Sequence, residues 1–97
     1  ELAKATPMVI DYETRMDRIL VTGEKTVTCY YTLLNVTKEE VDTAEFVRMM
    51  RPGLLDRYNQ HPALEWFRDR NIQIQHAYYG RDAQWVATIQ VPADVEK

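Results

Sequence analysis

The stretch Thr26-Val27-Thr28-Cys29-Tyr30-Tyr31-Thr32-Leu33 decides the fold class, because its side chains change character at every second residue. One face carries the apolar and aromatic side chains from Val27 to Leu33, and the other carries threonines and Tyr30. β-Branched and aromatic residues at this period are typical of a strand buried on one face. The preceding stretch, Met16 to Thr22, ends at the turn residues Gly23-Glu24-Lys25. Together the two stretches predict a β-hairpin between Thr14 and Val36.

A second hairpin is predicted towards the C-terminal end. The stretches Ile72 to Tyr79 and Gln84 to Val91 are both strand-like, Gly80-Arg81-Asp82-Ala83 supplies the turn, and Pro92 stops the second strand. The residues of both hairpins expected to face one core are Val27, Cys29, Tyr31, Leu33, Ile72, Ile74, Tyr78, Trp85, Ala87, Ile89 and Val91.

A helix is predicted between the hairpins. The segment Asp42-Thr43-Ala44-Glu45 fits a capping box, so the helix is expected to begin at Asp42, and Thr37-Lys38-Glu39-Glu40 offers an earlier start. Its buried stripe is Val47, Met50, Leu54 and Tyr58. Pro52-Gly53 lies inside this helix and predicts a kink or a break.

A second, short helix begins at His61-Pro62 and ends at Asn71. The order β-β-α-α-β-β predicts an α+β two-layer sandwich, a four-stranded antiparallel sheet with two helices on one face. A short fifth strand from Val9 to Tyr12 is an open alternative. We expect one domain over residues 14–92, a lead-in over 1–13 that links to a missing signal or anchor, and a tail over 93–97.

Composition argues against several classes of function. The 97 residues carry 15 acidic and 12 basic side chains, a formal net charge of −3, so no positive field favours nucleic acid. The single cysteine excludes an internal disulfide, and two histidines argue against a metal or catalytic cluster. We expect no cofactor, no metal and no enzymatic activity. No run approaches the ~18 apolar residues of a membrane helix, so membrane contact is expected only through a missing N-terminal segment.

An alternative interpretation of the function depends on Cys29 and His76. Both have the inward parity of their strands. We interpret Cys29 as a small buried apolar residue and His76 as a hydrogen-bonded histidine of the core or of the sheet end. The alternative is a cytosolic small-ligand-binding protein or enzyme that uses Cys29, His76 and nearby carboxylates. A deep pocket lined by His76 with a neighbour of perturbed pKa would favour that alternative, whereas a filled core would favour an interaction module.

Charged residues gather around the predicted helices. The acidic run is interpreted as structural or solvated, with two of its members explained by helix capping and the helix dipole, and consists of Glu39, Glu40, Asp42 and Glu45. The basic residues are interpreted as partners in ordinary surface ion pairs, with an anion-binding groove as the alternative, and are Arg48, Arg51, Arg57, Arg68 and Arg70.

Two pairs of consecutive tyrosines, Tyr30-Tyr31 and Tyr78-Tyr79, must each send one ring to each face of the sheet. The outward rings can either stabilise an exposed sheet by cross-strand packing or form a contact surface, since tyrosine is enriched where proteins meet. The hypothesised protein-contact residues are Tyr30, Tyr79, Thr28, Thr32, Gln73 and Gln75. The partner is expected to be another protein or a second copy of this chain.

Three segments carry a resemblance to a family of small bacterial envelope proteins of uncharacterised activity. They are Thr6 to Asp17, Tyr30 to Asn35 and Ala77 to Ala83, against a family pattern of P-M-x-V-D-x-x-T, then Y-x-Y-x-L-x-N, then A-Y-Y-G. The resemblance covers about Thr6 to Asp94 and implies an N-terminal signal or membrane anchor. Many members carry two cysteines where this chain has Tyr58-Asn59 and Asp94-Val95, so the resemblance implies no disulfide here.

The resemblance also implies an extracytoplasmic location in the bacterial envelope. The small-x-small segment Ala3-Lys4-Ala5 has the form of a signal-peptidase site and supports export. A free Cys29 without disulfides fits the alternative, a cytoplasmic protein. We therefore predict a non-enzymatic, envelope-associated accessory or protein-interaction module.

Overall fold

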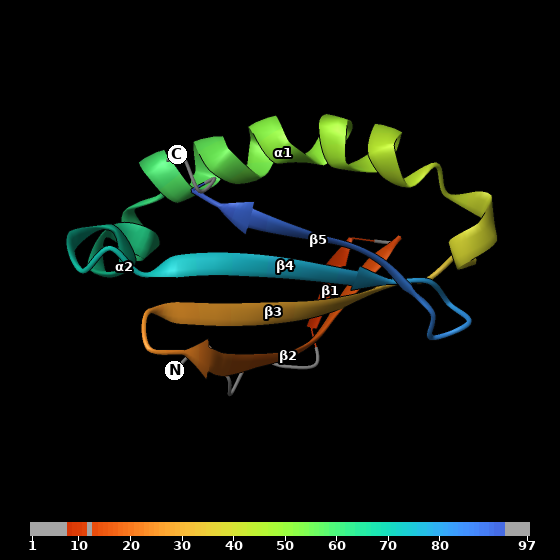
Figure 1. Ribbon diagram of the computed structural model, residues 1–97, viewed down its shortest axis with the longest axis horizontal. Helices are drawn as coiled ribbons and strands as arrows, with labels where there is room; N and C mark the ends of the chain where they lie inside the picture. Colours follow the sequence, from red (N-terminus) through yellow and green to blue (C-terminus); the bar gives the residue numbers. More distant parts are fainter. Residues whose placement is uncertain (1–7, 12, 93–97) are drawn as a thin grey trace.

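The computed structural model describes residues 8–11 and 13–92 and contains one five-stranded sheet and a helical layer (Figure 1). The strands are β1 (Met8–Asp11), β2 (Thr14–Gly23), β3 (Thr26–Leu33), β4 (Gln73–Tyr79) and β5 (Trp85–Val91). The helical elements are the 3-10 turns η2 (Lys38–Glu40) and η3 (Pro62–Leu64) and the helices α1 (Thr43–Gln60) and α2 (Glu65–Asp69). The α+β class and both hairpins are confirmed. The predicted tail, residues 93–97, and the Ala3-Lys4-Ala5 segment lie outside the described residues.

The sheet is mixed, so the prediction of a purely antiparallel sheet is wrong. Its strand order is β1-β2-β3-β4-β5, and every neighbouring pair is antiparallel except β3 and β4, which are parallel. The fifth strand is β1, which pairs with the start of β2. The parallel register sets Cys29 beside His76 and Tyr31 beside Tyr78.

The length of α1 explains the parallel pair. Its 18 residues span about 27 Å, and the 8 residues of β3 span about 26 Å, so the helix returns the chain along the whole strand. β4 therefore starts at the same end of the sheet as β3, and a crossover of this kind produces parallel strands. Hairpin patterns record only the pairing within each hairpin, so they do not give the direction of one hairpin relative to the other.

Both predicted cap segments are used, and the earlier one, Thr37 to Glu40, forms the full capping box. Asp42 caps α1, since the Glu45 backbone N–H donates to Asp42 Oδ1 at 3.1 Å. The earlier box caps η2, where the Thr37 N–H donates to Glu40 Oε1 at 2.8 Å. The predicted break at Pro52 is wrong, because α1 continues through it. The residue one turn earlier, Arg48, is exposed, so the carbonyl that loses its N–H partner can bond to water.

Replacing Asp42 with Ala should lower the free energy of unfolding by about 1 kcal/mol, because the Glu45 amide at the first turn loses its acceptor. Urea unfolding followed by circular dichroism measures this change. Glu39→Ala is the matched control, since Glu39 is an exposed acid of η2, and it should change stability by less than ~0.5 kcal/mol. Equal losses in both variants would contradict the capping role.

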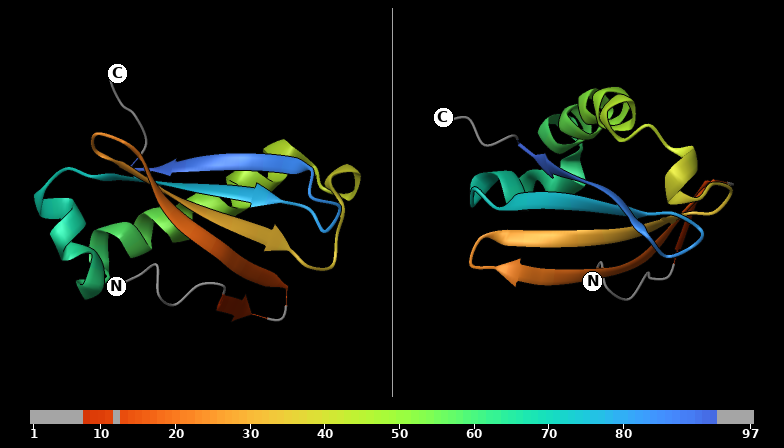
Figure 2. Two further views of the ribbon diagram at one scale, coloured as in Figure 1. Left: turned by 90° about the horizontal axis from the view of Figure 1, so that it is seen from below. Right: turned by 45° about the vertical axis from the view of Figure 1, so that its right-hand side comes forward.

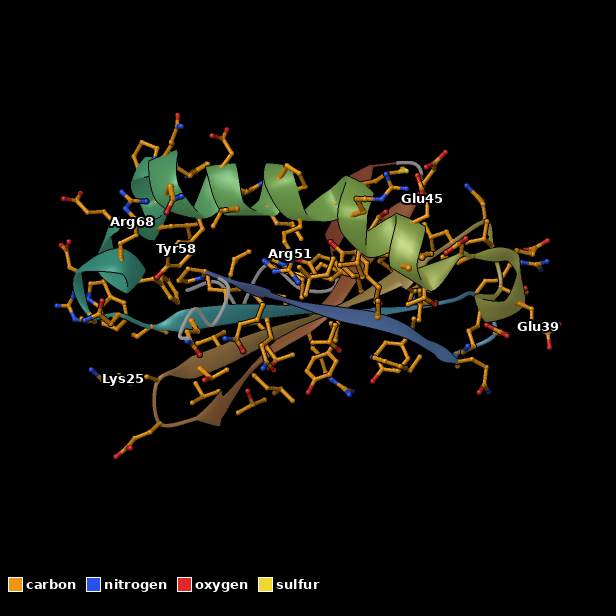
Figure 3. All side chains as sticks on the ribbon, turned by 45° about the horizontal axis from the view of Figure 1, so that its top comes forward. Lys25, Glu39, Glu45, Arg51, Tyr58 and Arg68 are labelled. Atoms are coloured by element: carbon orange, nitrogen blue, oxygen red, sulfur yellow. The ribbon has the colours of Figure 1, made fainter. Side chains whose placement is uncertain are left out.

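The core lies between α1 and the sheet. Tyr58 and Arg51 reach from α1 towards the strands (Figure 3); the Tyr58 hydroxyl donates to the Ile72 carbonyl at 2.7 Å. The predicted stripe is confirmed, because Tyr58 is buried and Val47, Met50 and Leu54 pack against the core.

No helix of the described part of the chain is long and apolar enough to cross a membrane.

A β-bulge in β5 overturns the predicted core position of Trp85. Tyr78 pairs with Ala87 but Tyr79 pairs with Trp85, so Val86 is an extra residue on β5. Val86 is 1% exposed in the core, whereas Trp85 is 51% exposed. The bulge shifts the alternation by one residue at the start of β5 and moves the indole out of the core.

Candidate functional site

No described helix covers the face of the sheet that lies opposite α1 (Figure 2). Seen from below, the strands β2 to β5 lie in front of α1. We call this surface the open face. All the predicted contact residues have the parity of this face: Thr28, Tyr30, Thr32, Gln73, Gln75 and Tyr79. Their inward neighbours Cys29, Tyr31 and Tyr78 are buried in the core, so the predicted parity of the two tyrosine pairs is confirmed.

A ladder of side-chain hydrogen bonds crosses the open face from β2 to β5. Thr22 Oγ1 lies 2.7 Å from Thr28 Oγ1, which donates to Gln75 Oε1 at 3.2 Å. Gln75 Nε2 donates to Gln90 Oε1 at 3.2 Å. Thr28 is only 4% exposed, so its hydroxyl supports the sheet and offers little surface to a partner.

Thr32 is also occupied within the chain. Its hydroxyl donates to Asp17 Oδ2 at 2.5 Å, and Asp17 pairs with Arg15. The polar part of the predicted contact surface therefore holds the strands together, as the cross-strand interpretation expects. Gln73 is half-buried at the start of β4, at the opposite end of this strand from Tyr79.

The aromatic part of the open face forms one row across four strands. The Arg18 guanidinium lies 4.5 Å from the centre of the Tyr30 ring, and the Tyr30 and Tyr79 ring centres are 6.4 Å apart. Trp85 is the cross-strand partner of Tyr79, and its Nε1 donates to Thr88 Oγ1 at 2.9 Å. We call Arg18, Tyr30, Tyr79 and Trp85 the aromatic row. It combines the side-chain types that most often dominate protein interfaces.

Sequence reasoning missed two members of the aromatic row. Arg18 lies in β2, where the register shifts between Met16 and Arg18 and the alternation is interrupted. Trp85 lies beside the Val86 bulge, which reverses its parity. No alternation rule locates a bulge, so these two positions required the paired strands themselves.

A pocket of about 240 Å³ lies on the other face, between the helical layer and β2–β4. Met50 and Leu54 of α1 contribute to one wall, and Cys29, Tyr31 and His76 of the strands contribute to the other. α1 packs mainly against β5, so the inner side of β2 is less covered; Val21 is 79% exposed. The core is therefore not completely filled, and the pocket is lined by His76, as the small-ligand alternative requires.

Three titratable side chains of this pocket, Cys29, Tyr31 and His76, are held in their neutral forms. The Tyr31 hydroxyl lies 2.7 Å from His76 Nδ1, and the two rings stack at 5.6 Å. Burial, and then the positive charge of Arg57, lower the pKa of His76 to about 4. Burial raises the pKa of the Cys29 thiol, against the opposing effects of its hydrogen bond to Tyr31 and of Arg57. A neutral thiol is a poor nucleophile, so this arrangement does not favour thiolate chemistry.

The described lining of the pocket contains no carboxylate beside Cys29 and His76. No Asp or Glu of the described residues lines it, so no carboxylate orients His76. Within the same part of the chain, no group of three or more His, Cys, Asp or Glu side chains could hold a metal ion. The pocket can bind an apolar molecule, and burial keeps its Cys29 thiol protonated.

The arginines of the helical layer mostly bind backbone carbonyls, so the prediction of ordinary surface ion pairs is wrong for most of them. Arg51 Nη1 donates to the Gln90 carbonyl at 3.1 Å, and Arg68 Nη1 donates to the Tyr58 and His61 carbonyls at 2.8 and 2.9 Å (Figure 3). Arg48 pairs with Glu45. Arg57 lines the pocket and takes part in none of the ion pairs found among the described residues.

The fold and its open face define a small α+β domain with one helix-covered and one uncovered sheet face. No family model matches the chain, and no curated protein matches it. A Pseudomonas aeruginosa protein classed as secreted has a similar fold, with a TM-score of 0.75 at 16% identity over 94% of this chain and 79% of that one. The pilotin EpsS of the Vibrio vulnificus type 2 secretion system is similar with a TM-score of 0.64 at 14% identity, over 93% of this chain and 76% of that one. At these identities the likeness establishes the fold alone.

Proposed function

We propose that this protein is a non-enzymatic accessory module of the bacterial envelope that binds another protein through the aromatic row. The observation that carries the proposal is the row itself, in which one guanidinium and three aromatic rings lie on a sheet face without a helix over it. Rigid aromatic rings contribute contact area at a low cost in conformational entropy. The polar ladder beside the row fixes the strands, so the surface is formed before a partner arrives.

Two further observations support an envelope role. Both similar structures come from proteins connected with secretion, one classed as secreted and one a secretion-system pilotin. The resemblance in Thr6 to Asp17 and Ala77 to Ala83 also implies envelope proteins with an N-terminal signal or anchor. Fractionation of cells that express the full reading frame tests this location, and recovery of the protein in the cytoplasm alone would overturn it.

Replacing Tyr30 and Tyr79 together with Ser should weaken binding through this face by about 30-fold, since truncating central aromatic anchors costs ~2 kcal/mol. The first partner to test is a second copy of the chain, by sedimentation of wild type and variant across a concentration series. Trp66→Ser is the matched control, because Trp66 is 54% exposed but lies in α2, away from the open face, and it should leave association unchanged.

A monomeric wild type would exclude the second copy as partner. A photo-crosslinking residue at position 30 or 79 in the native host then identifies the protein bound there, with position 49 of α1, which is 66% exposed, as the control. Crosslinks of equal yield from all three positions, or from position 49 only, would contradict a contact surface on the open face.

A further inference from the structure

We propose that the pocket between α1 and the inner side of β2–β4 binds a small alkyl carboxylate, with the alkyl chain in the apolar interior and the carboxylate on Arg57. This site lies on the face opposite the aromatic row and does not depend on the proposed function. The size, the lining and the charge of the pocket all match this ligand class.

The size of the pocket selects a small molecule. A cavity of ~150 Å³ lined by aliphatic and aromatic side chains accommodates a benzene ring. The pocket here is about 240 Å³, which leaves room for a short alkyl chain. An α-helix with side chains is ~10 Å wide, so a partner helix would not fit inside the pocket without displacing α1.

The lining selects an apolar body. Met50 and Leu54 of α1 and Ile74 of β4 surround the space, and burial keeps Cys29 and His76 of the lining neutral. The Tyr31 hydroxyl lies 2.7 Å from His76 Nδ1, so these two atoms are hydrogen-bonded to each other and need no polar group of the ligand as a partner. Burial of each methylene there is favourable by the ordinary hydrophobic effect.

The charge selects an acidic head group. Arg57 is exposed and is the charged residue of the lining, and no described Asp or Glu lines the pocket to neutralise it. The other arginines of the helical layer are occupied by Glu45 or by backbone carbonyls, as found for Arg48, Arg51 and Arg68. A guanidinium at the edge of an apolar pocket matches a carboxylate, to which it can donate two parallel hydrogen bonds.

Titration of the wild-type protein with hexanoate and octanoate by calorimetry tests the proposal. Octanoate should bind, and hexanoate should bind about 15-fold more weakly, because each methylene contributes about four-fold in affinity. The His76 ring signals in NMR spectra should shift on binding, and the Tyr30 and Tyr79 signals should not. Chain-length independence, or shifts confined to the open face, would overturn the proposal.

Three variants separate the head group from the tail. Arg57→Gln should lower octanoate affinity at least ten-fold and leave octanol affinity within two-fold, because only the charged head contacts residue 57. Arg48→Gln, an arginine of the same helix that does not line the pocket, should change neither affinity. Val27→Phe adds a ring to the pocket lining and should abolish both affinities; should it fail to fold, the two glutamine variants decide.

Two results would overturn the proposal. One is equal loss of octanoate and octanol binding in Arg57→Gln, which would mean that residue 57 shapes the pocket without holding a carboxylate. The other is Arg57-dependent co-sedimentation with phosphatidylglycerol vesicles without octanoate binding, which would assign the arginine to a lipid surface.

Discussion

Replacing Val86 with Asp should unfold the protein or lower its free energy of unfolding by more than ~4 kcal/mol, because the carboxylate would enter a core position that is 1% exposed. Small domains are stable by only ~5–15 kcal/mol, so a loss of this size removes much of the folded population. Val86→Ala tests the same position in a variant that should still fold, and its free energy of unfolding should be lower by ~2 kcal/mol. Thermal and urea unfolding report both.

Trp85→Asp is the matched comparison, one residue earlier in the chain. Trp85 is 51% exposed on the open face, so the variant should change stability by less than ~1 kcal/mol, the loss coming from its contact with Thr88. Unbroken alternation along β5 predicts the reverse order, with residue 85 in the core and residue 86 outside. A Trp85→Asp variant less stable than Val86→Asp would therefore rule out the bulge.

The stability of the wild type should fall by about 2 kcal/mol between pH 7 and pH 5 through His76 alone. Its pKa is about 4 in the folded protein and 6.5 as the ordinary value. Between these two values the unfolded chain binds a proton that the folded chain excludes, so acidification favours unfolding. The loss begins near pH 6.5 and levels off below pH 4, at about 3 kcal/mol in total.

Urea unfolding at several pH values measures this dependence. His76→Asn should flatten the profile between pH 7 and pH 5, because the proton-binding group is removed while the Tyr31 hydroxyl keeps a polar partner. Asn59→Ala is the control: Asn59 is an exposed, uncharged residue of α1, and the variant should keep the wild-type slope. An unchanged slope in His76→Asn would show that His76 is not the titrating group.

The candidate site was only partly predictable from sequence. Alternation in Tyr30-Tyr31 and Tyr78-Tyr79 placed one ring of each pair outward, because the period of a strand fixes the face of each side chain. The role of Thr28 was harder to anticipate, since its burial comes from neighbours on two adjacent strands. Arg57, which takes part in none of the ion pairs of the described residues, was not distinguishable among five arginines. The carbonyls that occupy Arg51 and Arg68 lie on other elements, so the sequence does not reveal them.

Local patterns by themselves determined the hairpins, the caps at Asp42 and His61, the stripe that ends at Tyr58 and the faces of most strands. These features depend on residues a few positions apart, where chain geometry is fixed by the helix and strand periods. Only the tertiary structure decided three features: the parallel pairing of β3 with β4, the presence of Val86 instead of Trp85 in the core, and the pocket beside α1. Each of these depends on how distant segments pack, and packing energy is a property of the assembled layers that no single segment contains.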